Sequence, residues 1–166
     1  STTASVHCVL AAHMTPKHRY LMQLVIMQLV ITNKLLSISS SSLVFNQNQG
    51  LESGGGLNMK DIVMSSDSNM TFTNNEASTG GAIAIQENAQ QVLLYNVIVN
   101  TSKASSLGGG IAIKNAKDIQ IIDSSITHSS SGTEGGGLFV DNSKKLTLKN
   151  VTFEGNHANT AGGAIR

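Results

Sequence analysis

The segment Gly108-Gly109-Gly110-Ile111-Ala112-Ile113 has close copies before and after it in the chain. Those copies begin at Gly54, Gly80, Gly135 and Gly162, so the glycine segments recur at a nearly constant interval of about 27 residues. A second marker keeps the same interval, because an aromatic or β-branched residue recurs once per unit from Phe45 to Phe153. Two markers that share one period of this length are typical of a solenoid or a repeat array.

The pattern inside each unit is that of short strands. Apolar residues alternate with polar or small ones in Leu146-Thr147-Leu148, in Val151-Thr152-Phe153 and in Ile83-Ala84-Ile85, which is the period of a half-buried strand. Each unit therefore holds about three short strands, separated by turns rich in Asn, Ser, Thr and Gly. Because these strands return to the same place in every unit, the sequence predicts an all-β, parallel β-helix with about 27 residues per coil.

Equivalent apolar residues of successive coils are predicted to stack into ladders. Neighbouring strands lie about 4.8 Å apart, so each ladder would repeat at that spacing through the core. The first ladder is Leu57, Ile83, Ile111, Leu138 and Ile165; the second is Met59, Ile85, Ile113 and Val140; the third is Phe45, Phe72, Val99, Ile126 and Phe153.

The paired glycines and the residues three places after the aromatic marker are assigned structural roles. Glycine suits a tight corner because it accepts a positive φ angle and has no Cβ to collide with the next coil. Asn or Ser at stacked turns can pass side-chain hydrogen bonds from coil to coil, a plain exposed turn being the alternative. The expected turn ladder is Asn48, Asn75, Ser102, Ser129 and Asn156, and the structural glycines are Gly54, Gly55, Gly80, Gly81, Gly108, Gly109, Gly135, Gly136, Gly162 and Gly163.

Two recurring tetrapeptides resemble a known family. Phe45-Asn46-Gln47-Asn48, Phe72-Thr73-Asn74-Asn75 and Phe153-Glu154-Gly155-Asn156 match F-x-x-N, while Gly80-Gly81-Ala82-Ile83 and Gly162-Gly163-Ala164-Ile165 match G-G-A-[ILV]. Their alternation over residues 34–166 resembles the repeats of the chlamydial polymorphic outer membrane proteins, and it is similar to repeats in other bacterial surface proteins and in large secreted proteins of protists. The resemblance implies a right-handed β-helix stalk on a cell surface, with a role in adhesion or assembly. Two units depart from the motifs, because Val99 and Ile126 replace the aromatic residue. These replacements are expected to leave the coil intact.

The composition fits an extracellular structural module. Charged residues make up 13% of the chain, aromatic residues 4%, and the net charge is +1. No basic stripe is present, which argues against a nucleic-acid partner. The lone Cys8 is interpreted as a small buried hydrophobe, with an intermolecular bridge as the alternative. The spacing of His7, His13 and His18 matches no familiar metal site, so we predict no metal, no cofactor and no catalytic residue.

Residues 1–33 lack both markers. Residues 20–31 form an apolar run too short to cross a bilayer as a helix, and the basic residues before it resemble the start of a signal peptide at Met14. The alternatives for 1–33 are an N-terminal cap, an atypical coil or a signal-like segment. Residues 34–166 would then form about five coils of a longer array. An open coil end leaves a bare sheet edge, which predicts self-association along the helix axis into a homo-oligomer or filament.

Three asparagines begin an Asn-x-Ser/Thr motif, namely Asn69, Asn100 and Asn150. Asn69 and Asn150 are separated by three repeat units, so they occupy the same place in their coils. In a secreting eukaryote these sites would carry N-glycans, on one face for the equivalent pair. In a bacterium the same motifs carry no such meaning.

An enzyme of the β-helix type, either a polysaccharide lyase or a glycoside hydrolase, is the alternative function. Such chemistry needs two or three carboxylates, or carboxylates with Arg and Lys, on the outer face of neighbouring coils. No acid stands at the outward positions after the glycines, and the acids along the chain do not recur at the period. We therefore expect an extracellular or cell-surface rod with a structural or adhesive role, in a fibre, filament or coat. The outward positions are Asn58, Ala84, Ala112, Phe139 and Arg166.

Overall fold

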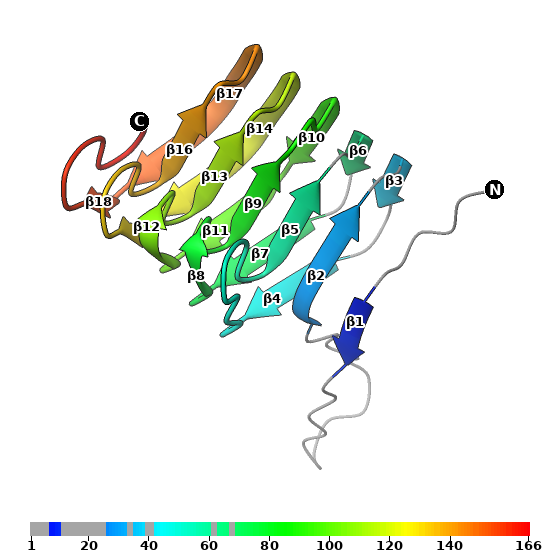
Figure 1. Ribbon diagram of the computed structural model, residues 1–166, viewed down its shortest axis with the longest axis horizontal. Helices are drawn as coiled ribbons and strands as arrows, with labels where there is room; N and C mark the ends of the chain where they lie inside the picture. Colours follow the sequence, from blue (N-terminus) through cyan, green and yellow to red (C-terminus); the bar gives the residue numbers. More distant parts are fainter. Residues whose placement is uncertain (1–6, 11–25, 33–34, 39–41, 61–62, 67–68) are drawn as a thin grey trace.

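Successive coils stack on one another, and from β5 (Leu57–Lys60) onward the chain winds through three sheets in each coil (Figure 1). The computed structural model describes residues 7–10, 26–32, 35–38, 42–60, 63–66 and 69–166. Every regular element within these residues is a β-strand. No helix in this part of the chain could therefore serve as a membrane span.

Sheet A contains the strands that follow the glycine segments. Its order is β1-β2-β5-β9-β13-β16, and all neighbours are parallel except β1 and β2, which are antiparallel. The strands are β1 (His7–Leu10), β2 (Ile26–Thr32), β5 (Leu57–Lys60), β9 (Ile83–Gln86), β13 (Ile111–Lys114) and β16 (Leu138–Asp141).

Sheet B forms the wall that carries the aromatic marker. Its order is β3-β6-β10-β14-β11-β7-β4, with β17 beside β14. The long strand β14 pairs with β10 through its first half and with β11 through its second half, so two strand positions of one coil merge there. The strands are β3 (Leu35–Ile38), β4 (Ser42–Asn46), β6 (Val63–Ser66), β7 (Asn69–Thr73), β10 (Gln91–Tyr95), β11 (Val97–Asn100), β14 (Asp118–Thr127) and β17 (Lys145–Glu154).

Sheet C closes the coil and was not predicted from the sequence. About three strands per unit were expected, yet a further short strand follows each turn ladder residue from Asn75 onward. Its inward side chains are small, because Ala77, Ala104 and Ser131 are the buried residues there. The alternation of large apolar and polar residues that marks a strand is therefore weak. The sheet has the order β18-β15-β12-β8, with β8 (Glu76–Thr79), β12 (Lys103–Leu107), β15 (Ser130–Ser131) and β18 (His157–Ala158).

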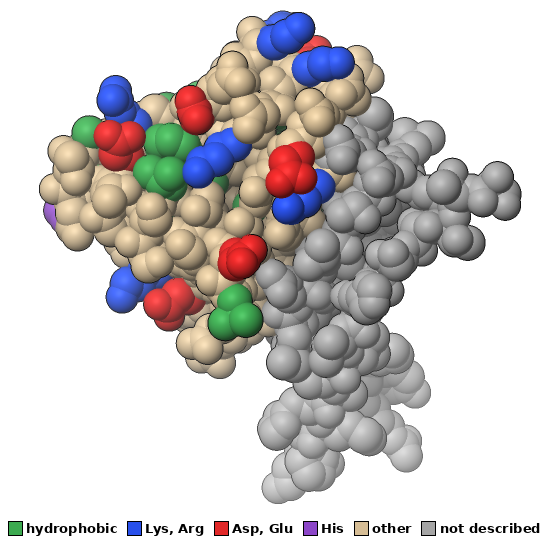
Figure 2. Space-filling view, in the orientation of Figure 1, with side chains coloured by type: hydrophobic (Ala, Val, Ile, Leu, Met, Phe, Trp, Pro, Cys, Tyr) green, Lys and Arg blue, Asp and Glu red, His purple; other side chains and the backbone are tan. Residues whose placement is uncertain are grey.

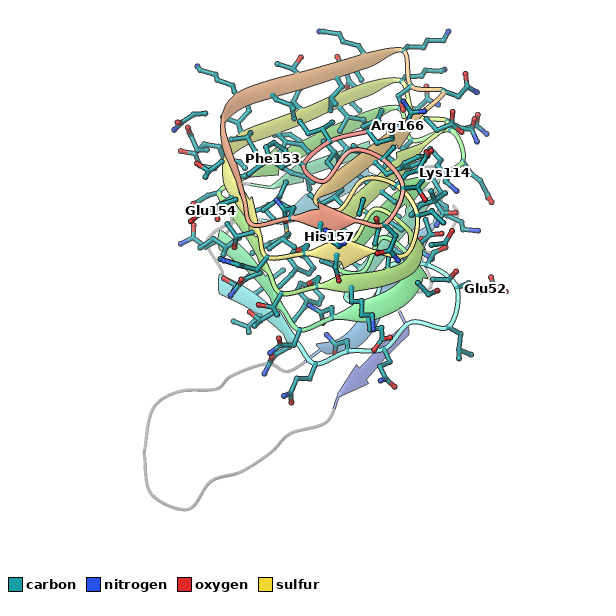
Figure 3. All side chains as sticks on the ribbon, turned by 90° about the vertical axis from the view of Figure 1, so that its left-hand side faces the viewer. Glu52, Lys114, Phe153, Glu154, His157 and Arg166 are labelled. Carbon is teal, nitrogen blue, oxygen red and sulfur yellow. The ribbon has the colours of Figure 1, made fainter. Side chains whose placement is uncertain are left out.

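The apolar ladders lie inside the coils in the predicted register. Ile83 pairs with Leu57 and with Ile111, and the register of sheet B places Phe72 between Phe45 and Val99. All of these side chains are 0–1% exposed. The apolar side chains are less buried in the last coil, which faces the viewer in Figure 3. There Phe153 lies inside the coil and is half-buried, and Glu154 lies outside it.

Candidate functional site

The predicted turn residues lie one above another between sheet B and sheet C. The Oδ1 atom of Asn75 accepts a hydrogen bond from the backbone N–H of Asn48 at 3.0 Å, and its Nδ2 atom donates to the carbonyl oxygen of Phe45 at 3.0 Å. Asn156 makes the equivalent pair, with the N–H of Ser129 at 2.9 Å and the carbonyl oxygen of Ile126 at 2.7 Å. These two asparagine side chains thus tie their turns to the backbone of the preceding coil.

Serine reproduces these contacts only in part in the middle of the turn ladder. The Oγ atom of Ser129 lies 3.4 Å from the backbone nitrogen of Ser102. The Oγ atom of Ser102 itself is buried and has no hydrogen-bond partner among the described residues. Because the serine side chain is one atom shorter and lacks the second polar atom, it reaches the preceding coil poorly.

The two glycines of each pair have different roles. Gly108 has a φ angle of +64° and turns the corner into sheet A. Gly109 lies against the following coil, where a Cβ would approach the carbonyl oxygen of Gly136 to 2.3 Å. At Gly163 the nearest atom to a Cβ would be the carbonyl oxygen of Asn156, at 3.0 Å. The first role recurs at Gly54, Gly80, Gly135 and Gly162, and the second recurs at Gly55, Gly81 and Gly136.

The three sequon asparagines lie on the wall formed by sheet B. Asn69 and Asn150 are exposed and share one ladder. Asn69 accepts a hydrogen bond from Asn96, and the Nδ2 atom of Asn150 donates to Asp123 at 2.8 Å. Asn100 is half-buried, and its Oδ1 atom accepts a hydrogen bond from Thr127 at 3.2 Å.

The positions of sheet A that were predicted to face outward are more buried than expected. The prediction came from their alternation with apolar residues along each strand. Ala84 and Ala112 are fully buried, and Phe139 is 8% exposed. The glycine corner accounts for this, because a Cβ on Gly108 would lie only 2.8 Å from the Cβ of Ala112. The ammonium group of Lys114 lies 5.6 Å from the centroid of the Phe139 ring and covers it further. This strip therefore offers little open surface to a ligand.

The carboxylates are distributed singly over the surface. No two of those whose side chains are described occupy the same position in neighbouring coils. On the face shown in Figure 2, acidic and basic side chains are interspersed among neutral ones. Three ion pairs join acids to bases among the described residues, all partly exposed and hence weak: Lys60–Glu87 at 3.1 Å, Lys145–Asp118 at 3.7 Å and Arg166–Glu134 at 3.4 Å.

The histidines considered as metal ligands are not brought together in the described part of the chain. His7 lies in β1, while His13 and His18 lie outside the described residues. No group of three or more His, Cys, Asp or Glu within the described residues could hold a metal ion.

A hollow of about 330 Å³ lies at the turn between sheet A and sheet B. Three stacked asparagines of this turn have left-handed backbones, with φ angles of 62° at Asn88, 53° at Asn115 and 48° at Asn142. Lys117 and Lys144 were not predicted as site residues, although Lys144 stands one repeat unit after Lys117 and this spacing could have identified them. The lining residues are Glu87, Asn88, Asn115, Ala116, Lys117, Asn142 and Lys144.

A comparison with protein families gives one match. The family model described as a right-handed beta helix region matches residues 30–165. No curated protein and no solved structure matches the chain. The family match and the parallel register of the coils confirm the predicted right-handed parallel β-helix. The chain belongs to the right-handed β-helix family.

Proposed function

We propose that this β-helix is a structural or adhesive rod outside the cell, at the cell surface, in a fibre, filament or coat. The observation that carries the proposal is the outward ladder formed by Asn69, Asn96, Asp123 and Asn150. Side-chain hydrogen bonds join Asn69 to Asn96 and Asp123 to Asn150 across neighbouring coils. A surface that repeats similar polar groups, three carboxamides and one carboxylate, at successive coils suits multivalent binding, because weak contacts add along the rod.

The sequence motifs support the external location through resemblance. The alternation of F-x-x-N and G-G-A-[ILV] resembles the repeats of the chlamydial polymorphic outer membrane proteins. Phe72 is a core residue and Asn75 a turn ladder residue, so the motifs describe how the coil is built. The choice of a surface protein within the wider β-helix family therefore rests on this resemblance and on the low charge of the chain.

The polysaccharide lyase or glycoside hydrolase is less well supported by the placement of the acids. General acid and base catalysis on a sugar requires two carboxyl groups that flank one bond. Glu87 is paired with Lys60 and Glu134 with Arg166, and the described carboxylates stand at different positions in their coils. This arrangement of the carboxylates favours a structural or adhesive surface over a catalytic one.

Self-association along the helix axis is part of the proposal. In the described chain β17 has its parallel partner β14 on one side, and Leu148 and Ile165 in the last coil are 36% and 42% exposed. A further coil, from the same chain or from a second copy, would pair with this edge and cover both side chains. N-glycans on Asn69 and Asn150 would project from the wall of sheet B and leave the axis free.

A test of polysaccharide cleavage separates the rod from the enzyme. The purified chain is incubated with acidic and neutral polysaccharides, and new reducing ends and unsaturated sugars are measured, with heat-unfolded protein as the control. The rod predicts no products above that control. Products that disappear in the variant Glu87→Gln would overturn the proposal and assign the hollow to a lyase or hydrolase.

A further inference from the structure

We infer that the hollow between sheet A and sheet B binds an acidic carbohydrate chain, with Lys117 and Lys144 as its anion-binding groups. The ligand class is a linear oligosaccharide that carries carboxylate or sulfate groups. The inference deepens the proposed adhesive role and rests on it for its biological setting, whereas the binding itself is a property of the folded chain.

Lys117 and Lys144 place two positive charges at the same position of neighbouring coils. Their backbone N–H groups donate to the carbonyl oxygens of Ala89 and Ala116, one coil earlier in each case. Neighbouring coils are about 4.8 Å apart, and like charges held at the same place of two neighbouring turns repel each other. An anion that contacts both ammonium groups would remove this repulsion.

The lining does not supply that anion from within the described residues. Its one acid, Glu87, is already paired with Lys60 at 3.1 Å. Lys117 donates a hydrogen bond to the neutral Gln90 at 2.6 Å, and neither Lys117 nor Lys144 forms an ion pair with a described carboxylate. The hollow therefore has an uncompensated positive charge that faces the solvent, which attracts an anionic ligand.

The asparagines of the lining favour a sugar over other anions. Asn88, Asn115 and Asn142 present stacked carboxamides, which both donate and accept hydrogen bonds and so suit hydroxyl groups. The Nδ2 atom of Asn142 donates to the Oδ1 atom of Asn115 at 2.6 Å, so these amides are aligned along the helix axis. None of the described lining residues is aromatic, so the hollow shows no ring on which a nucleic-acid base could stack.

The spacing of the site fits a chain that runs along the helix axis. One sugar residue is about as long as the distance of about 4.8 Å between coils. Each coil would therefore meet one sugar, through an asparagine and, in the coils of Lys117 and Lys144, a lysine. Lysine is a compact point charge that accepts either a carboxylate or a sulfate, so the two chemistries are separated by experiment.

Isothermal titration at low ionic strength tests the site on the folded chain. The probes are a hexamer of galacturonic acid and a heparin hexasaccharide, and the controls are neutral maltohexaose and inorganic sulfate. The double variant Lys117→Gln/Lys144→Gln should lose affinity for the bound hexamer by about tenfold or more, because charge-assisted hydrogen bonds are lost. The matched control is Lys103→Gln/Lys149→Gln, which removes two exposed lysines elsewhere and should change the affinity less than about threefold.

The outcomes are distinct. Binding of either acidic hexamer that is lost only in Lys117→Gln/Lys144→Gln supports the site, and the preferred hexamer identifies the uronate or the sulfate. Absence of binding, equal losses in the two double variants, equal binding of maltohexaose, or displacement by an equal concentration of inorganic sulfate would each overturn it. If no acidic hexamer binds this site, the proposed structural rod still stands. If the protein is found inside the cell, the titration result is unchanged.

Discussion

The rings of Phe45 and Phe72 stack face to face, with their centroids 4.5 Å apart and their planes 2° from parallel. The two residues stand at the same position of successive repeats, so one coil of chain separates them. Both are fully buried, and the ring of each repeats the orientation of the other. Their stacking shows how a fixed period in the sequence becomes a fixed translation along the helix axis.

Truncation of this ladder should destabilise the coil according to burial. We expect Phe72→Ala to lower the free energy of unfolding by about 3–5 kcal/mol, the range for a fully buried aromatic residue. Phe153→Ala makes the same chemical change at a half-buried site of the same ladder and should cost about half as much. Urea denaturation followed by circular dichroism measures both. Equal losses would contradict the gradient of cover along the ladder.

One substitution in the turn ladder should stabilise the folded chain. Ser129→Asn places an Oδ1 atom within reach of the N–H of Ser102, whose present contact is 3.4 Å long. We expect the free energy of unfolding to rise by about 1 kcal/mol, the net worth of a hydrogen bond. A variant no more stable than the parent chain in the same urea titration would show that the serine contact is already adequate.

The equivalent change one coil earlier should fail for a steric reason. Gly137 faces Asn156, since a Cβ there would lie 2.9 Å from its Nδ2 atom. Backbone hydrogen bonds place Ala82 on the same ladder as Gly137, so an asparagine at position 102 would meet the Ala82 methyl group. We therefore expect Ser102→Asn to destabilise the chain, and Ser102→Asn with Ala82→Gly to restore it. Stabilisation by the single change would contradict this packing.

Two glycines with different surroundings should differ in how well they tolerate substitution. A Cβ on Gly109 would lie 2.3 Å from the carbonyl oxygen of Gly136, so Gly109→Ala should cost about 3 kcal/mol or more. Gly155 is the control, because the three atoms nearest to a Cβ there all belong to the side chain of His128 and not to the backbone. The equivalent residue Asn74 adopts a φ angle of 54° without being glycine, so Gly155→Asn should cost less than about 1 kcal/mol. Thermal unfolding compares the two, and a larger loss at Gly155 would refute the assignment.

Glycan occupancy should follow exposure when the chain is secreted from a eukaryotic host. Asn69 and Asn150 are exposed, whereas Asn100 is half-buried and hydrogen-bonded to Thr127. We expect intact-mass spectrometry to show mass that N-glycan removal abolishes, and site mapping to assign it to Asn69 and Asn150. The double variant Asn69→Gln/Asn150→Gln should lose that mass. Occupancy at Asn100 alone would contradict the expectation.

The ladders of sheets A and B could be predicted because they repeat large apolar residues at a constant period. Ile83, Ile111 and Leu138 follow glycine pairs and stand in register in the structure. Sheet C could not be predicted in the same way, since its inward residues such as Ala77 and Ala104 are small and resemble those of a turn. Its position depends on the coil having to close, which no local pattern encodes.

The burial and shape of the surface could not be predicted from the sequence, because they depend on contacts between coils. Ala112 was placed on the outer face, yet the glycine corner covers it completely. The hollow was also missed, because Lys117 and Lys144 resemble ordinary exposed turn residues until three coils place their asparagines beside them. Periodicity thus predicted the stack of coils, while burial of short side chains and the shape of the turns required the folded structure.

Surface labelling of intact cells tests the proposed external rod most directly. An epitope inserted between Leu51 and Glu52 would be accessible, since Leu51 is 98% exposed and Glu52 lies at the outer edge of the coil in Figure 3. Cells that make the tagged protein are labelled with antibody before and after permeabilisation, with an internal protein as the control for leakage. We expect labelling of intact cells at the level seen after permeabilisation. Labelling that appears only after permeabilisation would contradict the external location.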